Sequence, residues 1–170
     1  RSGKDRINLT EKLPPSNNEV FLKIGRELSK IYLTTTDSNG VITKVYFNNK
    51  KETIPFNGID AGTHFTFNYN QFVFGNNNIL NVFNADKEKM IALELEENIT
   101  SPPFFVSKNK IGVITNPDIY LINKEGEIEE GFPLNGSTPF SIADINNDKT
   151  VNLVVIDGNK VVTYNLKDNF

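Results

Sequence analysis

The chain has no cysteine and no tryptophan, and it has a single histidine and a single methionine among 170 residues. Without cysteine it can form no disulfide bond, and it carries no thiolate nucleophile or thiolate metal ligand. The lone histidine, His64, has no second histidine or suitable carboxylate close to it in sequence, as a zinc site would require. These absences exclude a disulfide scaffold and cysteine catalysis, and they argue against a histidine-based metal centre.

Long hydrophobic runs are also missing. None approaches the roughly 18 residues that a membrane-spanning helix requires, and the start of the chain shows no signal-peptide pattern. The chain opens with Arg1-Ser2-Gly3-Lys4 instead of methionine. We interpret this as the cut end of a processed form or of a longer protein.

The charges show no excess of one sign that would direct the protein to a charged partner. The formal net charge is −3, and acidic and basic residues are mixed along the chain. A nucleic-acid-binding surface needs a basic face, and a polybasic membrane contact needs clustered lysine and arginine. We therefore expect no nucleic-acid partner and no electrostatic membrane anchor.

Turn-forming and strand-forming residues dominate what is present. Asparagine is abundant, and it favours turns because it tolerates left-handed backbone angles. There are 13 phenylalanines, which together with isoleucine, valine and tyrosine suit the half-buried surface of a sheet. The composition predicts an all-β fold of many short strands.

The strand signals recur with a regular period. Strands that open successive sets are expected to begin at Ile31, Phe72, Ile111 and Val151. Their even spacing matches the repeat of a β-propeller blade, which holds four strands in roughly 40 residues. An irregular β-sandwich with evenly spaced strands is the alternative.

We predict one β-propeller-like domain over residues 1–170. Its repeats are placed near 31–70, 71–110 and 111–150, with a fourth made of 151–170 completed by 1–30. Candidate strands for that completion lie at Ile7–Leu13 and Val20–Ile24. The ring is either a closed one of four blades or part of a larger one, completed by further residues of a longer chain or by self-association.

The densest local signal follows Phe140, where Asp144, Asn146, Asp148 and Asn152 precede a β-branched run. With Gly131-Phe132-Pro133-Leu134 before it and the strand ending at Tyr164 after it, the region 131–166 resembles the FG-GAP/VCBS repeats. That resemblance implies a propeller blade of the integrin-alpha type, an extracytoplasmic or cell-surface setting, and a calcium loop that crosses between blades. Two positions depart from the pattern of that family: Lys149 replaces a preferred glycine and Asn152 replaces an acid.

Two interpretations of this loop remain open. Calcium takes six to eight oxygen ligands, and Asp144, Asn146, Asp148, the Thr150 carbonyl and Asn152 could supply five. The same aspartates and asparagines could instead accept hydrogen bonds from the backbone amides of the turn and brace it. The formal side-chain charge of −2 and the neighbouring Lys149 favour the bracing role.

Other candidate residues have simpler structural explanations. His64 adjoins an aromatic strand and is expected to be half-buried or at an edge. The carboxylates of Glu94, Glu96 and Glu97 are expected to form a solvated strand end. Tyr120 and Tyr164 could stack on sugars, but packing between blades is the simpler prediction. The phenylalanine runs and Tyr69 are expected to lie in the core between neighbouring sheets.

The sequence predicts a non-catalytic binding module for a protein or glycan ligand. No catalytic constellation or nucleophile elbow is present. Two alternatives stay open: a purely structural part of a larger propeller, or a hydrolase or lyase on a propeller scaffold. The enzyme would require convergence of at least two carboxylates on the central channel, from a set that includes Asp60, Asp118, Glu130 and Asp144.

Overall fold

A computed structural model describes residues 23–27, 30–36, 41–46, 50–56 and 63–166 of the chain. Within these ranges the fold is all-β, as predicted, with fifteen strands in four antiparallel sheets. These ranges contain no helix that is long and apolar enough to cross a membrane.

The strands form the sheets in sequence order. The first sheet contains β1 (Lys23–Glu27), β2 (Lys30–Thr36), β3 (Val41–Tyr46) and β4 (Lys51–Pro55). The second contains β5 (His64–Asn68), β6 (Gln71–Asn76), β7 (Ile79–Phe83) and β8 (Lys89–Glu94). The third contains β9 (Phe104–Ser107), β10 (Lys110–Ile114), β11 (Asp118–Asn123) and β12 (Leu134–Asn135). The fourth contains β13 (Ser141–Ala143), β14 (Asn152–Asp157) and β15 (Lys160–Asn165).

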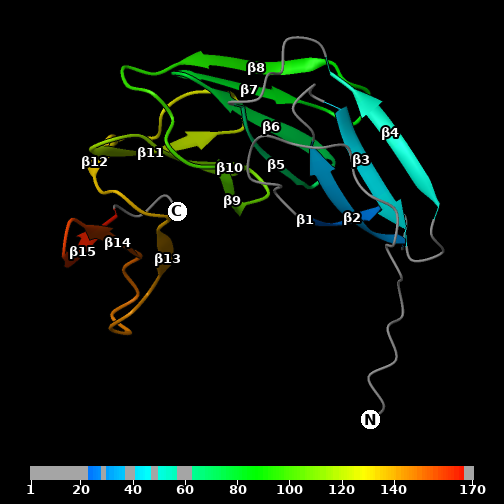
Figure 1. Cartoon of the computed structure of the whole chain (residues 1–170). Coiled ribbons are helices and arrows are strands. Elements are labelled where there is room, and N and C mark those ends of the chain that lie inside the picture. Colours follow the sequence, from blue (N-terminus) through cyan, green and yellow to red (C-terminus); the bar gives the residue numbers. More distant parts are fainter. Residues whose placement is uncertain (1–22, 28–29, 37–40, 47–49, 57–62, 167–170) are drawn as a thin grey trace.

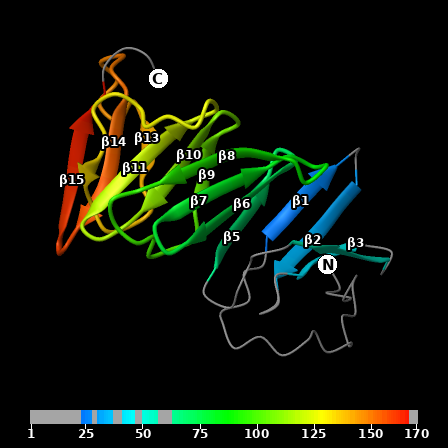
Figure 2. The same ribbon diagram turned by 90° about the horizontal axis from the view of Figure 1, so that it is seen from above.

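The four sheets follow one another along an open arc (Figure 1). Seen from above, they stand in a row from the first sheet to the fourth (Figure 2). The sheets formed by the described residues do not close into a ring. The first strand of each sheet lies on the inner side of the arc, and the later strands lie progressively outward (Figure 1).

Period-two alternation along the strands builds a separate apolar core between each pair of neighbouring sheets. In β6, Phe72 and Phe74 belong to the core shared with the first sheet, whereas Val73 between them belongs to the core shared with the third. In β11 the alternation is the same, because Tyr120 packs toward the second sheet and Leu121 toward the fourth. Each inner sheet is therefore apolar on both faces.

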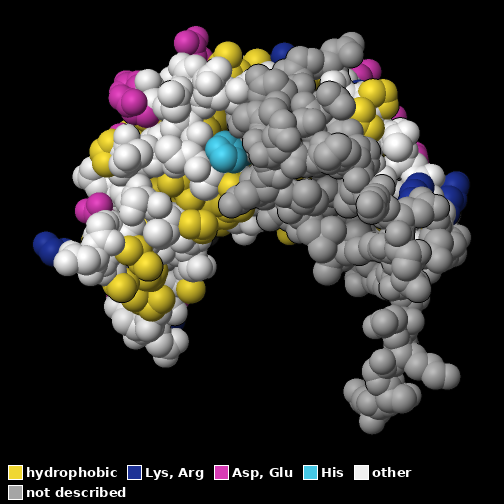
Figure 3. All heavy atoms as spheres, in the orientation of Figure 1, with side chains coloured by type: hydrophobic (Ala, Val, Ile, Leu, Met, Phe, Trp, Pro, Cys, Tyr) yellow, Lys and Arg dark blue, Asp and Glu magenta, His cyan; other side chains and the backbone are white. Residues whose placement is uncertain are grey.

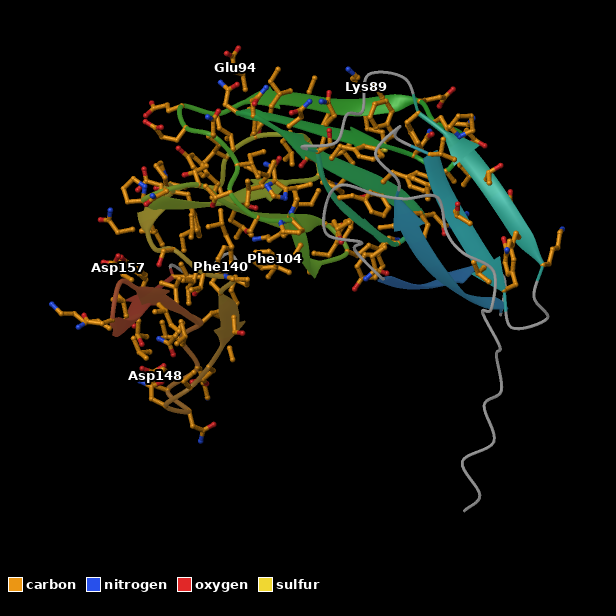
Figure 4. The ribbon with its side chains drawn as sticks, in the orientation of Figure 1. Lys89, Glu94, Phe104, Phe140, Asp148 and Asp157 are labelled. Carbon is orange, nitrogen blue, oxygen red and sulfur yellow. The ribbon has the colours of Figure 1, made fainter. Side chains whose placement is uncertain are left out.

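The contact between the third and fourth sheets depends on a close approach of a ring to the backbone. A Cβ atom placed on Gly112 of β10 would lie 2.4 Å from Cζ of Phe104. The Phe104 ring also packs edge-on against Phe140, with centroids 5.0 Å apart. Figure 4 shows these two phenylalanines meeting at the junction of the sheets.

Two turns, one in the second sheet and one in the third, repeat almost atom for atom. The side-chain oxygen of Asn84 accepts the N–H groups of Asp86 and Glu88, and its amide donates to the Glu88 carboxylate. Asn123 makes the same three bonds to Glu125 and Glu127. The two turns, which follow β7 and β11, show that the second and third sheets are copies of one structural repeat.

The predicted repeat boundaries differ from the observed sheets by one strand. The range 31–70 joins β5 to the first sheet, but β5 pairs with β6 through the turn at Tyr69-Asn70. Both turn residues have positive φ angles, 49° and 60°, which is typical of a tight hairpin. Each expected opening strand is therefore the second strand of its sheet.

The predicted completion of the fourth repeat by residues 1–30 is also corrected in part. The strand β1 lies within that range and pairs with β2 in the first sheet, so it cannot complete the fourth. The candidate strand Ile7–Leu13 lies outside the described residues, and its role stays a prediction.

Candidate functional site

The loop over residues 144–151 joins β13 to β14, which are antiparallel neighbours in the fourth sheet with Ala143 opposite Asn152. The resemblance to FG-GAP/VCBS repeats implied a crossover from one blade to the next. The observed loop instead connects two strands of one sheet. It lies at the end of the sheet opposite the β14–β15 turn (Figure 2).

The loop is held by backbone amides that donate to aspartate side chains. The two carboxylate oxygens of Asp144 accept the N–H groups of Asp148 and Lys149, at 3.2 and 2.9 Å. The Asp148 carboxylate accepts the N–H of Thr150 at 2.7 Å and the side-chain amide of Asn146 at 2.7 Å. These bonds are the bracing arrangement that the sequence analysis favoured.

The hydrogen bonds that Asp148 accepts favour its charged form. Above all the backbone N–H of Thr150, and then the Asn146 side chain, lower the pKa of the Asp148 carboxyl from its ordinary value. Asp148 is therefore ionised at neutral pH and lies at the exposed tip of the loop below the fourth sheet (Figure 4).

Asn152 is buried and serves as the internal support of the loop. Only 2% of it is exposed. Its side-chain oxygen accepts the N–H of Ile145, and its amide donates to the side-chain oxygen of Asn165 on β15. An aspartate here could not donate the second bond, which explains why asparagine suits this position without a metal.

Lys149 adopts a left-handed backbone conformation, with φ 70°. The family pattern has glycine here, and glycine adopts positive φ without steric cost. We expect Lys149→Gly to raise the free energy of unfolding by about 0.5–1 kcal/mol, since relief of strain outweighs the added chain entropy. Urea unfolding measures the change. An exposed control with ordinary φ, Lys160→Gly, should instead destabilise the protein, and equal losses in both variants would contradict the prediction.

The loop carries some of the oxygen atoms that a calcium site would need, and calcium binding stays a prediction. Asp144, Asn146 and Asp148 are exposed and retain oxygen lone pairs. Asn152 does not fit as a ligand, because it is buried and its side chain bonds Ile145 and Asn165 inside the sheet. Within the described ranges, no three histidine, cysteine, aspartate or glutamate side chains gather closely enough to hold a metal ion.

The carboxylates considered for catalysis are not brought together among the described residues. Asp118 begins β11, whereas Asp144 follows β13 at the opposite end of the strands. Glu130 is exposed between β11 and β12. Asp60 lies outside the described residues.

His64 and the acidic cluster lie where the sequence predicted. His64 is half-buried at the start of β5, the edge strand of the second sheet, and the histidine side chain is visible at the surface in Figure 3 (cyan). Glu94 ends β8 and accepts a hydrogen bond from the Asn78 amide. Glu96 and Glu97 follow it and are exposed.

Tyr120 and Tyr164 pack between sheets, as predicted, and do not form exposed platforms for sugars. Tyr120 is 2% exposed, and among the described residues its hydroxyl has no hydrogen-bond partner. Burial raises the pKa of this hydroxyl, and the nearby carboxylates of Asp118, Glu96 and Glu97 raise it further. Tyr164 is half-buried, and its hydroxyl donates to the Asn135 carbonyl at 3.0 Å.

This difference between the tyrosines gives a matched pair of variants. We expect Tyr120→Phe to change the free energy of unfolding by less than about 0.5 kcal/mol or to raise it, because it removes a buried hydroxyl that has no partner. Tyr164→Phe should lower it by about 0.5–1.5 kcal/mol through loss of a hydrogen bond. Thermal or urea unfolding checks both, and a larger loss from Tyr120→Phe than from Tyr164→Phe would contradict the assignment.

One aromatic residue expected in the core is exposed instead. Tyr69 is 47% exposed on the β5–β6 turn, and its ring contacts Phe105 of the third sheet edge-on, with centroids 5.5 Å apart. Its φ of 49° is rare for a bulky side chain. Two left-handed residues turn the chain here, which places Tyr69 outside the alternation that buries Phe65 and Phe67. The Tyr-Asn pair is not a standard turn signal, so the sequence did not indicate this exposed aromatic group.

No protein-family model matches the chain, and no curated protein gives a significant match. Solved structures do resemble it. A chain in the crystal structure of BBS1N in complex with ARL6DN aligns with a TM-score of 0.65 and 14% identity, covering 92% of this chain and 54% of that one. Saccharomyces cerevisiae Sqt1 gives a TM-score of 0.58 at 12% identity over 81% and 41% of the two chains. Virginiamycin B lyase from Staphylococcus aureus gives 0.56 at 13% identity over 92% and 59%.

These similarities define the class of fold. The matched structures are β-propeller-like, and the described strands follow them in four successive antiparallel sheets. This chain is therefore β-propeller-like. It spans about half the length of the first solved structures that it matches.

Proposed function

We propose that the chain is a non-catalytic protein-binding module. The observation that carries this proposal is the exposed Tyr69 ring, held against Phe105 at the junction of two sheets. Tyrosine is enriched where proteins bind one another, since it offers a large contact area at low conformational cost. A left-handed backbone at a bulky residue is a cost that a binding role would explain.

Two further points support the proposal. BBS1N, the propeller-like protein named in the best-aligned structure described above, is in complex with ARL6DN. The resemblance of residues 131–166 to FG-GAP/VCBS repeats supports an extracytoplasmic or cell-surface setting. Propeller folds host many functions, so the exposed side chains identify the binding surface better than the fold does.

The test is binding by the whole chain. A partner identified by cross-linking and mass spectrometry is purified, and its affinity is measured by calorimetry for the unaltered chain, Tyr69→Ala and Ile79→Ala. Ile79 is a suitable control because it is also exposed, at 42%, but begins β7 at the other end of the strands. Tyr69→Ala should weaken binding at least tenfold and Ile79→Ala should not. Equal affinities would overturn the proposal, and binding of oligosaccharides alone would show a glycan ligand.

Weak calcium binding by the loop is part of the same proposal, with Asp144, Asn146, Asp148 and the Thr150 carbonyl as the ligands. For a dissociation constant near 1 mM, 10 mM calcium would add about 1.4 kcal/mol and raise the melting temperature by roughly 3–5 °C. Asp144→Asn should abolish this rise. An unchanged melting temperature of the unaltered chain across millimolar calcium concentrations would contradict the proposed site.

Asn152→Asp is a second variant that tests which residues bind calcium. Without calcium, this variant should melt well below the unaltered chain, because it places a carboxylate in a buried site and loses the bond to Asn165. If the loop holds calcium through Asp144, Asn146, Asp148 and the Thr150 carbonyl, calcium should raise the melting temperatures of the variant and of the unaltered chain by similar amounts, because the buried position 152 supplies no ligand. A clearly stronger response of the variant would contradict this ligand set.

A further inference from the structure

The chain contains one Asp-Gly pair and three Asn-Gly pairs. In such a pair the backbone nitrogen of glycine can attack the side-chain carbonyl carbon of the preceding residue, because glycine has no Cβ atom to hinder the approach. In a flexible peptide, asparagine reacts faster than aspartate by this route. The described residues include two of the pairs, Asn135-Gly136 and Asp157-Gly158, whereas the pairs at 39–40 and 57–58 lie outside them.

The Asn135-Gly136 pair is held firmly at the end of β12. Gly136 is buried, and its N–H donates to the Pro117 carbonyl at 2.9 Å. A Cβ atom placed on Gly136 would lie 2.7 Å from a methyl carbon of Val155. The Asn135 side-chain amide donates to the Asp118 carboxylate at 3.4 Å. The attacking nitrogen and the side chain that it would attack are therefore both engaged, and this pair can react only after the end of β12 opens.

The Asp157-Gly158 pair forms the tip of the β14–β15 hairpin, at the edge of the molecule (Figure 4). Residues 156–160 are all exposed. Gly158 has φ 58°, and a Cβ atom placed on it would have no atom within 4 Å apart from its chain neighbours. Among the described residues, neither the Asp157 carboxylate nor the Gly158 N–H has a hydrogen-bond partner. Both reacting groups are free.

Few contacts hold this tip in place. The last bonds to a neighbouring loop are at Ile156, whose carbonyl accepts the N–H of Ser137 and whose N–H donates to Thr138 Oγ1. Beyond Ile156, the pairing of Asp157 with Lys160 closes the turn. Since the side chains of the tip are exposed, opening it returns little apolar area to water. Segments with few buried contacts open locally at low free energy, which lets the backbone adopt the geometry of attack.

We propose that Asp157 is a site of isoaspartate formation, and that the fold reverses the order of reactivity that the two pairs would have in a flexible peptide. The Gly158 nitrogen bonds to Cγ of Asp157 and gives up its proton, and one carboxyl oxygen leaves as water, which forms a cyclic imide. Water then adds to the backbone carbonyl carbon of the imide. The bond from that carbon to the Gly158 nitrogen breaks, and the nitrogen regains a proton.

The chain of the product runs through the side chain of residue 157, so it has one additional backbone carbon and an unchanged mass. The additional carbon lies between Asp157 and Lys160, which are opposite each other across the turn. It should therefore disturb the pairing of β14 with β15 at this end. The proposal concerns a surface different from Tyr69 and does not depend on the proposed function.

Peptide mapping of the whole chain tests the proposal. Folded protein is kept for weeks at neutral pH and body temperature and is then digested. Isoaspartate at position 157 blocks cleavage by endoproteinase Asp-N, which distinguishes it from aspartate of the same mass, and deamidation of Asn135 changes the mass of its peptide. We expect product to form at least threefold faster at Asp157 than at Asn135 in the folded chain. In guanidinium chloride, where the chain is unfolded, Asn135 should react faster than Asp157.

Asp157→Asn is the matched variant, because both sites are then Asn-Gly pairs and the ratio of their rates reports the fold alone. Deamidation should be at least tenfold faster at position 157 than at Asn135 in the folded variant, and the two rates should be similar in the unfolded variant. Equal rates in the folded variant, or faster reaction at Asn135, would overturn the proposal. Isoaspartate that forms at Asp157 only in the unfolded chain would also overturn it, because the hairpin would then hold the backbone away from the geometry of attack.

Discussion

Gly112→Ala should destabilise the protein by about 2–3 kcal/mol, at the upper end of the cost of overpacking a core. The new methyl group would lie 2.4–2.8 Å from three atoms of the Phe104 ring. That ring cannot retreat freely, because it packs against Phe140 on the side of the fourth sheet. Urea unfolding followed by circular dichroism measures the loss.

A second substitution distinguishes this clash from a general intolerance of β10. Leucine at position 104 lacks the three ring atoms that the new methyl group would meet. Phe104→Leu alone should be destabilising, but the double variant should be more stable than the sum of the single effects predicts, by about 1 kcal/mol or more. Strict additivity would show that Gly112 is required for a reason other than the ring.

The strands were predictable because their signals are local. The alternation of Phe72, Val73 and Phe74 indicates a strand buried on both faces, and the structure confirms this arrangement. The period of the repeat was predicted from the even spacing of Ile31, Phe72, Ile111 and Val151. The equivalent turns that begin at Asn84 and Asn123 in successive sheets agree with that period. Such patterns depend on residues close in sequence, so they can be recognised without knowing which strands pair with one another.

The grouping of strands into sheets could not be predicted in the same way. The hairpin at Tyr69-Asn70 has no glycine, and no local rule marks it as a tight turn. Gly112 is covered by Phe104 on the neighbouring strand β9, a contact that no local pattern in the sequence indicates. The stretch from Ile128 to Leu134 contributes only Leu134 to a strand, β12, because Gly131 has φ 90° and Pro133 lacks an N–H.

In the candidate site, too, local features were predictable from the sequence and features that depend on other strands were not. The oxygen-rich loop joins two strands, as predicted, but both strands belong to the fourth sheet, so the expected crossover between blades was wrong. The bracing bonds of the loop follow from the types and spacing of its residues. The burial of Asn152 and its bond to Asn165 depend on β15, the next strand along the chain. The exposure of Tyr69 depends on two left-handed backbone angles. Both are properties of the assembled sheet, and residue type alone did not indicate them.

Phe74→Ala should destabilise the protein by about 3–5 kcal/mol, the range for removing a buried phenylalanine. The Phe74 ring is 2% exposed and contacts the rings of Phe56, Phe65 and Phe83, with centroids 4.9, 5.3 and 5.8 Å away. These rings form the core between the first and second sheets. Removal of the Phe74 ring should therefore weaken the contact between the first and second sheets more than the contacts between the other sheets.

Phe83→Ala is the matched control, because this ring belongs to the same cluster but is only half-buried. Phe83→Ala returns less apolar area to water, so it should lower the free energy of unfolding by about half as much as Phe74→Ala. Hydrogen exchange adds a readout specific to position. In Phe74→Ala, amides of β3 and β6 should exchange faster at denaturant concentrations where those of β11 and β14 remain protected. Uniform loss of protection across all four sheets would show instead that the row unfolds as one cooperative unit, and that the aromatic core stabilises the whole arc.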